Sequence, residues 1–393
     1  MSIISNFLKT DLRCKSKFII NMGCKGWLGF RKFKKPRKNS ELFPAFQFIS
    51  ITNDCNLNCQ GCWVTADLNH KDHLNIDTIH AIIKESKKQG SHFFGILGGE
   101  PLMYKQVTDI FGKHPDCYFQ LFTNGTLFTT GIAEKLRKTA NVTPLFSLEG
   151  DELVADIRRG GKNVYNRTLD AIRTSVRHGL ITGVAVSVCK SNINMALSPE
   201  FVRMLHDMGV LYVWYYIYRP AGENPNYELA LDREDIIRLR QFLVDGRIKF
   251  PIIMIDSYWR ADGEPFCPAA EGLSHHINAS GYIEPCPVIQ LARENIVDGN
   301  IKNLYENSEF LKDFRNSILH KTKGCVLMED PLWISRFAQK HDAMNTSNRP
   351  EMLTQFENAP VVTSHGSIPA IPEKSWIYRF AKETAFFGMG AYG

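Results

Sequence analysis

The chain has 393 residues, of which 44% are hydrophobic and 22% charged, and its net charge at pH 7 is +6. This length allows a large buried core, and the composition is ordinary for a folded enzyme, so disordered and collagen-like classes are excluded. The charge is unevenly distributed: residues 1–38 carry +10 and the rest of the chain −4. Because the rest of the chain is not basic, we expect no nucleic-acid-binding groove there.

The sequence shows no targeting or membrane-spanning pattern. No apolar run reaches the ~18 residues that a spanning helix requires. The ten cysteines occur without a secretory signal, which favours a reducing compartment where cysteines hold metals or take part in catalysis. We therefore predict a cytoplasmic protein.

The first segment, residues 1–44, is a basic arm in which lysines are interspersed with aromatic and aliphatic side chains. We favour a helical arm that packs on the rest of the protein and continues into a basic linker, Arg31–Lys38. The alternative is contact of residues 1–40 with an anionic membrane surface, where basic and aromatic side chains together anchor a segment.

From Ala45 onward, apolar runs typical of buried strands alternate with helical stretches. The expected strands are Phe46–Thr52, His92–Leu97, Tyr118–Thr123, Thr143–Leu148, Thr182–Val188 and Leu211–Tyr218. The expected helices between them lie near residues 77–89, 105–113, 130–139, 163–178 and 198–208. This alternation predicts parallel strands with crossover helices and a functional site at the carboxyl ends of the strands.

Three cysteines, Cys55, Cys59 and Cys62, directly follow the first expected strand. Three thiolates can hold three irons of a [4Fe–4S] cluster and leave the fourth iron open to another ligand. The alternative is a structural zinc with a fourth ligand from elsewhere. Zinc sites usually show two short cysteine pairs, whereas this stretch has one triplet, so the pattern favours the cluster.

This triplet resembles the signature of the radical S-adenosylmethionine (SAM) superfamily. The resemblance implies an α/β fold with a partial (β/α)6 barrel, here residues 45–225, which binds a [4Fe–4S] cluster and SAM. It also implies reductive cleavage of SAM to a 5′-deoxyadenosyl radical, which abstracts hydrogen from a substrate. The three cysteines would be the catalytic cluster ligands.

Further motifs at the ends of the expected strands resemble the same superfamily. Gly98-Gly99-Glu100-Pro101 resembles the motif that binds the SAM amino group, and Glu100 offers an acceptor for an ammonium. By the same resemblance, the SAM pocket would also include Thr123, Asn124, Ser147, Glu149 and Asn192. The alternatives are that Thr123 and Asn124 only form the turn that Gly125 permits, and that Ser147 and Glu149 contact the substrate. Glu149 stands where the superfamily commonly has aspartate.

Three arginines and two other cysteines accompany these motifs. We expect Arg158 and Arg159 in a loop, where the resemblance suggests that one of them orders the site or pairs with the SAM carboxylate. Arg219 follows the sixth strand and is expected to reach substrate or SAM. Cys117 and Cys189 are expected to be buried core thiols rather than ligands.

A second cysteine group, Cys267, Cys286 and Cys325, lies in residues 226–345. The alternating stretch around Gly281 predicts a β-hairpin that delivers Cys286. This pattern resembles the SPASM/Twitch extension of radical SAM enzymes, which implies a small α+β extension with one auxiliary [4Fe–4S] cluster. The candidates for its fourth, non-cysteine ligand are His275, His276, Glu329 and Asp330. The alternative is that these three are unrelated core cysteines.

The remaining segments predict further helices and a tail. We expect helices near residues 232–244 and at Leu304–Ile318, Leu332–His341 and Glu373–Phe387, and a strand-like run at Pro251–Asp256. Residues 346–393 form the C-terminal tail, and its end, Phe386–Gly393, is expected to cover the barrel or to dock a partner.

The function that these observations favour is a radical SAM enzyme that receives its electron from a reductant such as flavodoxin or ferredoxin. Two substrate classes remain: a peptide or protein, and a lipid or small molecule. A peptide-recognition domain ahead of the barrel is not expected within 44 residues. A non-catalytic iron–sulfur or zinc-binding electron-transfer or structural protein is the alternative, against which the turns Gly98–Pro101 and Thr123–Gly125 argue, because such a protein needs no SAM pocket.

Overall fold

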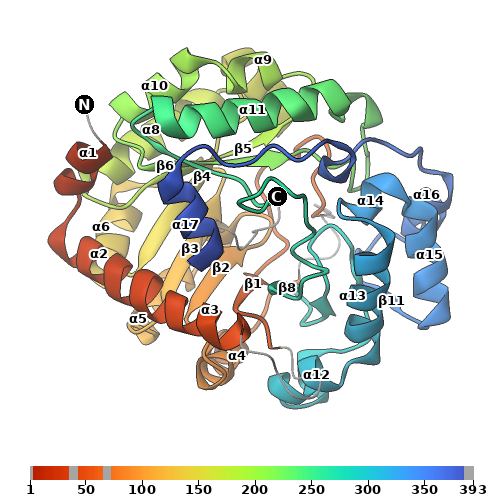
Figure 1. Ribbon diagram of the computed structural model, residues 1–393. Coiled ribbons are helices and arrows are strands. Elements are labelled where there is room, and N and C mark those ends of the chain that lie inside the picture. The colour runs from red at the N-terminus through yellow and green to blue at the C-terminus, as the bar shows by residue number, and fades with distance from the viewer. Residues whose placement is uncertain (1–2, 35–42, 65–71, 385–393) are drawn as a thin grey trace.

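The computed structural model describes residues 3–34, 43–64 and 72–384. The basic residues 35–38 and the segment Phe386–Gly393 lie outside the described residues. Within the described part, an α/β fold is built on one nine-stranded sheet with helices around it (Figure 1). The predicted fold class is confirmed.

The six predicted strands are all present and lie side by side in chain order, each parallel to the next. They are β1 (Phe46–Ser50), β2 (Phe93–Leu97), β3 (Tyr118–Thr123), β4 (Val142–Ser147), β5 (Gly183–Val188) and β6 (Tyr212–Ile217). Because all six run the same way, the loops that follow them meet at one end of the sheet.

Three further strands extend this sheet at its edges. β7 (Ile253–Ile255) is parallel to β6, and β8 (Ser274–Ile277) is parallel to β1 at the other edge. β9 (Ile283–Glu284) is antiparallel to β8, so the predicted hairpin before Cys286 is confirmed. This hairpin joins the barrel sheet itself and therefore brings Cys286 toward the barrel.

The predicted crossover helices are confirmed, and two other expectations are corrected. They are α4 (Ile76–Lys88), α5 (Val107–Lys113), α6 (Thr130–Thr139), α8 (Val164–Arg177) and α10 (Pro199–Asp207). Where a loop was expected, Glu152–Arg159 forms α7, because Asp151 caps its first turn and Gly160 ends it. The expected helix Leu304–Ile318 is two helices, since the Ser308 hydroxyl accepts a hydrogen bond from the Leu311 N–H at 3.0 Å and begins a new one.

The other described elements complete the molecule. They are α9 (Ile193–Ala196), α11 (Arg233–Lys249), α12 (Ile301–Asn307), α13 (Glu309–Lys321), α14 (Val326–Glu329), α15 (Pro331–Lys340), α16 (Met352–Asn358), α17 (Trp376–Thr384), the short strands β10 (Leu291–Ala292) and β11 (Met344–Asn345), and the 3-10 turns η2 (Pro101–Met103), η3 (Tyr227–Leu229), η4 (Ile296–Asp298) and η5 (His365–Ser367). None of the helices in the described residues is both long and apolar enough to cross a membrane.

The N-terminal arm is helical and packs on the barrel, as the favoured interpretation expected. It consists of α1 (Ile3–Lys9), α2 (Leu12–Lys17), the π-helix η1 (Phe18–Lys25) and α3 (Gly26–Lys34). The Asn6 amide donates to the His206 carbonyl at 2.8 Å, and the buried Asn21 amide donates to the Pro115 and Cys117 carbonyls at 3.0 Å. These buried hydrogen bonds fix the arm at the amino ends of the strands.

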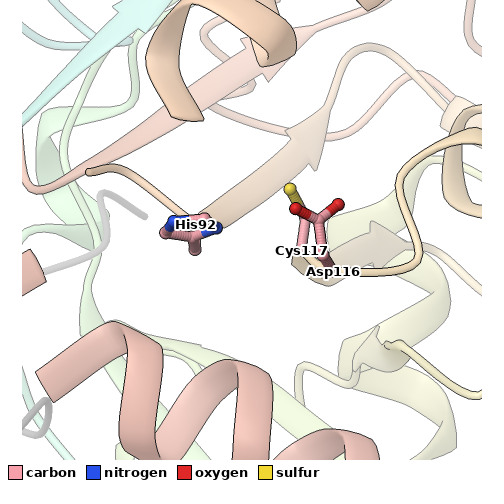
Figure 2. A group of neighbouring side chains, drawn as sticks. All are labelled: His92, Asp116 and Cys117. Atoms are coloured by element: carbon pink, nitrogen blue, oxygen red, sulfur yellow. The ribbon is translucent and has the colours of Figure 1, made fainter. Parts of the chain in front are cut away.

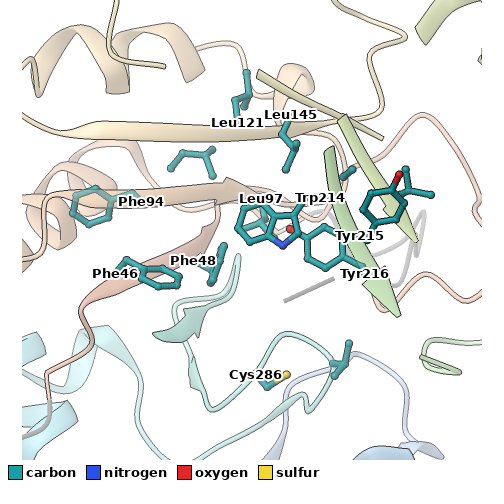
Figure 3. Packing of buried hydrophobic residues seen from close by; sticks show 14 of the residues in the cluster. Phe46, Phe48, Phe94, Leu97, Leu121, Leu145, Trp214, Tyr215, Tyr216 and Cys286 are labelled. Carbon is teal, nitrogen blue, oxygen red and sulfur yellow. The ribbon is translucent and has the colours of Figure 1, made fainter. Parts of the chain in front are cut away.

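The core has two layers, one on each face of the sheet (Figure 3). Trp214 and Tyr216 point into the barrel, whereas Tyr215 between them packs against Phe242 of α11 at a ring distance of 6.2 Å. A parallel sheet covered on both faces must be apolar on both. This explains why the strands read as continuous apolar runs.

Candidate active site

A cavity with about 1140 Å³ of empty space, its opening included, lies at the carboxyl ends of the strands. Most of the residues predicted from the motifs line it. Those in the lining are Cys55, Cys59, Cys62, Gly98, Gly99, Thr123, Asn124, Ser147 and Glu149. Glu100, Pro101 and Asn192 are absent from the lining.

The cysteine loop is held in place by the backbone of neighbouring turns. The Gly99 N–H donates to the Thr52 carbonyl at 2.9 Å, and the Glu100 N–H donates to the Asp54 carbonyl at 2.7 Å. Gly222, after β6, has φ of +90°, and a Cβ there would lie 1.8 Å from the Cys62 carbonyl oxygen. Glycine is therefore required at this close approach, which fixes the end of the loop.

Glu100 is buried behind the cavity wall, where it orders a turn. Its carboxylate accepts hydrogen bonds from the Leu102 N–H at 3.0 Å, the Thr123 hydroxyl at 2.7 Å and the Asn124 N–H at 2.7 Å. Burial raises the pKa of this carboxyl, against these hydrogen bonds. The three donors leave one of the four acceptor positions of the carboxylate open, and the contact of Glu100 with an ammonium stays a prediction.

Asn192 has an equally internal role. Its amide nitrogen donates to the carbonyls of Glu149 and Ser187, at 2.8 and 2.9 Å, and its amide oxygen accepts from the Cys189 N–H at 2.8 Å. Asn192 therefore joins the ends of β4 and β5. Cys117 and Cys189 are buried, as predicted.

Two arginines and Glu149 line the cavity beside the cysteines. Arg159 pairs with Glu149 and donates to the Cys59 sulfur at 3.8 Å, and Arg158 lies 3.8 Å from Glu149. Both arginines come from the unexpected helix α7, which ends at the cavity because Gly160 stops it there. With Arg219, the lining has three guanidinium groups and one carboxylate, so it is net positive.

This donor set fits an anionic iron–sulfur group and a polar ligand. Burial raises the pKa of the Cys55 thiol to about 11 and that of Cys62 to about 12, so a bound metal is what would stabilise the thiolates. The positive lining complements the negative charge of a thiolate-ligated cluster. The buried Tyr216 hydroxyl has no hydrogen-bond partner among the described residues and faces the same cavity.

The second cysteine group also comes together. Cys267, Cys286 and Cys325 are close enough for each thiol to influence the pKa of its neighbours, although burial is the main reason that the Cys267 pKa rises to about 11. Burial lowers the pKa of Arg219, but Tyr258, Cys325 and Cys286 raise it more, and Arg219 donates a hydrogen bond to Cys325. Arg219 therefore lies between the cavity and the second group, a position that sequence reasoning did not assign.

Three of the residues considered for a fourth ligand are engaged elsewhere. The His275 ring stacks on Tyr305 at 5.4 Å. His276 bonds to Ser50 and to Glu284, both at 2.7 Å. Asp330 caps α15 by accepting from the Trp333 N–H.

Glu329 bonds to Thr322 and Ser364. It lies four residues from Cys325, and nothing in its contacts assigns it to a metal.

In the described residues, neither cysteine triplet is among the groups whose ligand atoms all lie within 4.8 Å of one another. One tetrahedral zinc would gather its thiolates at ~3.8 Å, whereas a [4Fe–4S] cluster spreads three thiolates over three irons.

One compact group does occur in the described residues, at the opposite end of the strands (Figure 2). His92 precedes β2, while Asp116 and Cys117 precede β3, and their ligand atoms lie within 4.8 Å of one another. Asp116 is already paired with Lys87 at 2.8 Å, and burial raises the pKa of Cys117 to about 12. We therefore do not assign a metal there.

Fold and cavity together define an α/β half-barrel with three cysteine thiols in the cavity at the carboxyl ends of its strands. Residues 49–213 match the model of the Radical SAM superfamily, so the chain contains a radical SAM domain. The cofactors of this domain class are a [4Fe–4S] cluster and SAM, in agreement with the sequence prediction.

The comparisons with individual proteins agree at the level of fold. The chain is 28% identical to a "Probable GTP 3′,8-cyclase" of Methanocaldococcus jannaschii, over 64% of this chain and 86% of that one. It is 21% identical to the "Sporulation killing factor maturation protein SkfB" of Bacillus subtilis, over 67% of this chain and 65% of that one. SuiB of Streptococcus suis bound to SAM superposes with a TM-score of 0.61 over 70% of this chain and 68% of that one, at 17% identity.

Proposed function

We propose that the chain is a radical SAM enzyme whose cluster is held by Cys55, Cys59 and Cys62. The observation that carries this proposal is that the three thiols of one loop line the same cavity as the turns after β2, β3 and β4. An electron carrier needs no such cavity, so the non-catalytic alternative is disfavoured.

The chain's own residues would bind and orient the cofactors. Bound together, the reduced cluster and SAM supply a 5′-deoxyadenosyl radical that abstracts hydrogen from the substrate. Arg158 and Arg159 offer positive charge to the cluster and to a carboxylate, and Ser147 and Asn124 offer polar contacts along the wall. Glu100 acts indirectly by ordering the turn at Thr123 and Asn124.

We further propose that Cys267, Cys286 and Cys325 hold one auxiliary [4Fe–4S] cluster, in a Twitch-like extension within residues 226–345. The support is that three buried or half-buried thiols from three separate segments converge beside the Arg219 guanidinium. Convergence of this kind is unexpected for unrelated core cysteines.

Anaerobic reconstitution tests both assignments. The wild-type protein should bind iron and sulfide for about two clusters per chain and cleave SAM when reduced. Changing Cys55, Cys59 and Cys62 to Ala should abolish cleavage, and unchanged cleavage would refute the assignment. Changing Cys267 and Cys286 should remove about half of the iron, with Cys24→Ala, an exposed thiol, as the control.

The electron donor would be a low-potential reductant such as flavodoxin or ferredoxin. For the substrate, a peptide and an amphiphile are both compatible with a cavity of this size. SuiB has been crystallised with its precursor peptide, which keeps the peptide class open for this chain.

A peripheral membrane contact of an otherwise cytoplasmic protein is the second part of this proposal. Exposed apolar side chains alternate with lysines on the N-terminal helices, among them Leu12, Ile19, Ile20 and Leu28. Sedimentation with phosphatidylglycerol vesicles, and with phosphatidylcholine vesicles as the uncharged control, tests it. If the protein sediments with neither vesicle type, the proposed membrane contact is refuted.

A further inference from the structure

A second cavity lies inside the same half-barrel, at the amino ends of the strands. It holds about 570 Å³ of empty space, its opening included. Its deep wall consists of buried side chains such as Phe93, Tyr118 and Trp214, so it is mainly apolar. Its polar lining residues include Thr143 and Gln120. The Gln120 amide nitrogen donates to the Tyr212 hydroxyl at 2.8 Å, and its amide oxygen has no partner among the described residues.

The two cavities follow each other along the same strands. Thr143 lines the second cavity and Ser147 the first, four residues apart on β4, or about 13 Å along a strand. Between the cavities lie aromatic rings: Trp214 stacks on Tyr216 at 5.3 Å and lies tilted at 6.4 Å from Phe122. A ligand in the second cavity is therefore separated from the candidate active site by side chains alone.

The second cavity opens at the side of the barrel. Its partly exposed lining residues are Phe18 and Met22 on η1 and Ile253 and Ile255 on β7, so the opening lies between these two elements. β7 is the edge strand of the sheet, and α17 is attached to it by the Tyr378 hydroxyl, which accepts a hydrogen bond from the Met254 N–H at 3.0 Å.

The surface around this opening is apolar. Ile19 and Ile20, next to Phe18, are about half exposed, and on α17 Trp376 and Phe380 are more than 60% exposed. Figure 1 shows α17 and the N-terminal helices on the same side of the sheet. Exposed apolar side chains therefore occur both on η1, which borders the opening, and on α17, which is attached to β7.

We propose that this cavity binds the single apolar chain, alkyl or isoprenoid, of an amphiphilic substrate, which enters between η1 and β7 from an anionic bilayer. The proposal rests on the proposed function for the chemistry and assigns its substrate class. Lys15, Lys17 and Lys25 flank the exposed side chains and are partly buried. Their ammonium groups donate to the Leu8, Pro115 and Asp116 carbonyls, so this side of the arm carries fixed positive charge, which an anionic surface would complement.

The test uses full-length, cluster-reconstituted protein and cis-parinaric acid, a fatty acid whose fluorescence rises in apolar surroundings. We expect saturable binding to one site per chain. Primary alcohols should compete with the probe, and their affinity should rise about fourfold per added methylene until the cavity is full. Ile253→Trp should weaken binding at least tenfold, and Met22→Trp on the opposite rim provides a second blocking variant in case the first does not fold.

The matched control is Ile248→Trp, the same change at an exposed position of α11 outside the cavity lining. Its binding should equal that of the wild type. Binding that is unsaturable, or equal in the blocking and control variants, would overturn the proposal.

Delivery of the probe from phosphatidylglycerol vesicles should be faster than from phosphatidylcholine vesicles, and equal rates would overturn the bilayer as the source. SAM cleavage without substrate is measured separately, so loss of the proposed function and loss of chain binding are distinguishable.

Discussion

Single residues decide the electrostatics of the candidate site. The Arg219 guanidinium is buried, lies 5.3 Å from the Tyr258 ring and donates to Cys325. It also lines the first cavity. A fixed positive charge at this position favours electron-rich forms of anything that the neighbouring thiols hold.

Replacing this charge should therefore shift the redox potential of the auxiliary cluster proposed at Cys267, Cys286 and Cys325. Arg219→Gln should lower its midpoint potential by on the order of 50–100 mV, because a unit charge a few ångströms away in a buried site is removed. Redox titration followed by electron paramagnetic resonance measures the shift. Arg219→Lys keeps the charge and should restore most of the potential, whereas equal potentials in Gln and wild type would exclude this role.

Glu100 gives a second residue-scale prediction. Glu100→Gln keeps the shape but removes the charge that strengthens three hydrogen bonds, so the turn at Thr123 and Asn124 should loosen. We expect a loss of about 1.5–3 kcal/mol in the free energy of unfolding, measured by urea titration of the cluster-free protein. Because no cofactor is present, a loss here reports on the turn; a change confined to SAM affinity would instead mean that Glu100 contacts SAM.

Elements were predictable where their signals are local. The six strands are apolar runs bounded by turn residues, and the motif residues follow them directly, so sequence alone located most of the cavity wall. Helix α7 carries its own signals, Asp151 and Gly160, and was missed because its apolar face is short. The pairing of β8 with β1 joins residues more than 200 apart, which no local pattern reports.

The attachment of α17 is likewise non-local, and it depends on buried ion pairs. Asp256, after β7, lies 2.5 Å from Arg247, 2.9 Å from Lys382 of α17 and 3.3 Å from Arg240, and all four side chains are buried. Burial raises the pKa of Asp256, but the three cations together lower it well below its usual value. The carboxylate thus compensates several charges that water does not reach.

Asp256→Asn should cost about 3–5 kcal/mol of unfolding free energy, because it leaves buried cations unbalanced. The folded pKa lies below the unfolded one, so this contribution is complete above about pH 4 and is lost as the pH falls further. Urea titrations at pH 7 and pH 3 should differ less for the variant than for wild type. Asp245→Asn removes an exposed pair with Lys374 and should cost less than about 1 kcal/mol; equal costs for the two variants would contradict this account.

At the scale of the whole molecule, the sheet and the loops that carry the cysteines are stabilised by different interactions. The open sheet is held by strand pairing and by a core buried on both faces. Residues 53–62, in contrast, have no regular secondary structure, and the cysteine side chains there are only partly buried. Metal binding is therefore expected to order the site without creating the fold.

Removing the iron should consequently have a local effect. We expect the cluster-free protein to keep its far-ultraviolet circular dichroism, while amide hydrogen exchange accelerates in peptides covering residues 53–62 and those around Cys267, Cys286 and Cys325. Peptides from β2 to β6 should exchange as slowly as in the reconstituted protein, since their hydrogen bonds do not involve the thiols. Mass spectrometry of matched samples measures this, with the Cys55→Ala, Cys59→Ala, Cys62→Ala variant showing acceleration at the first loop alone. Faster exchange throughout the sheet would mean that the clusters stabilise the whole fold, and that the half-barrel is not an independent scaffold.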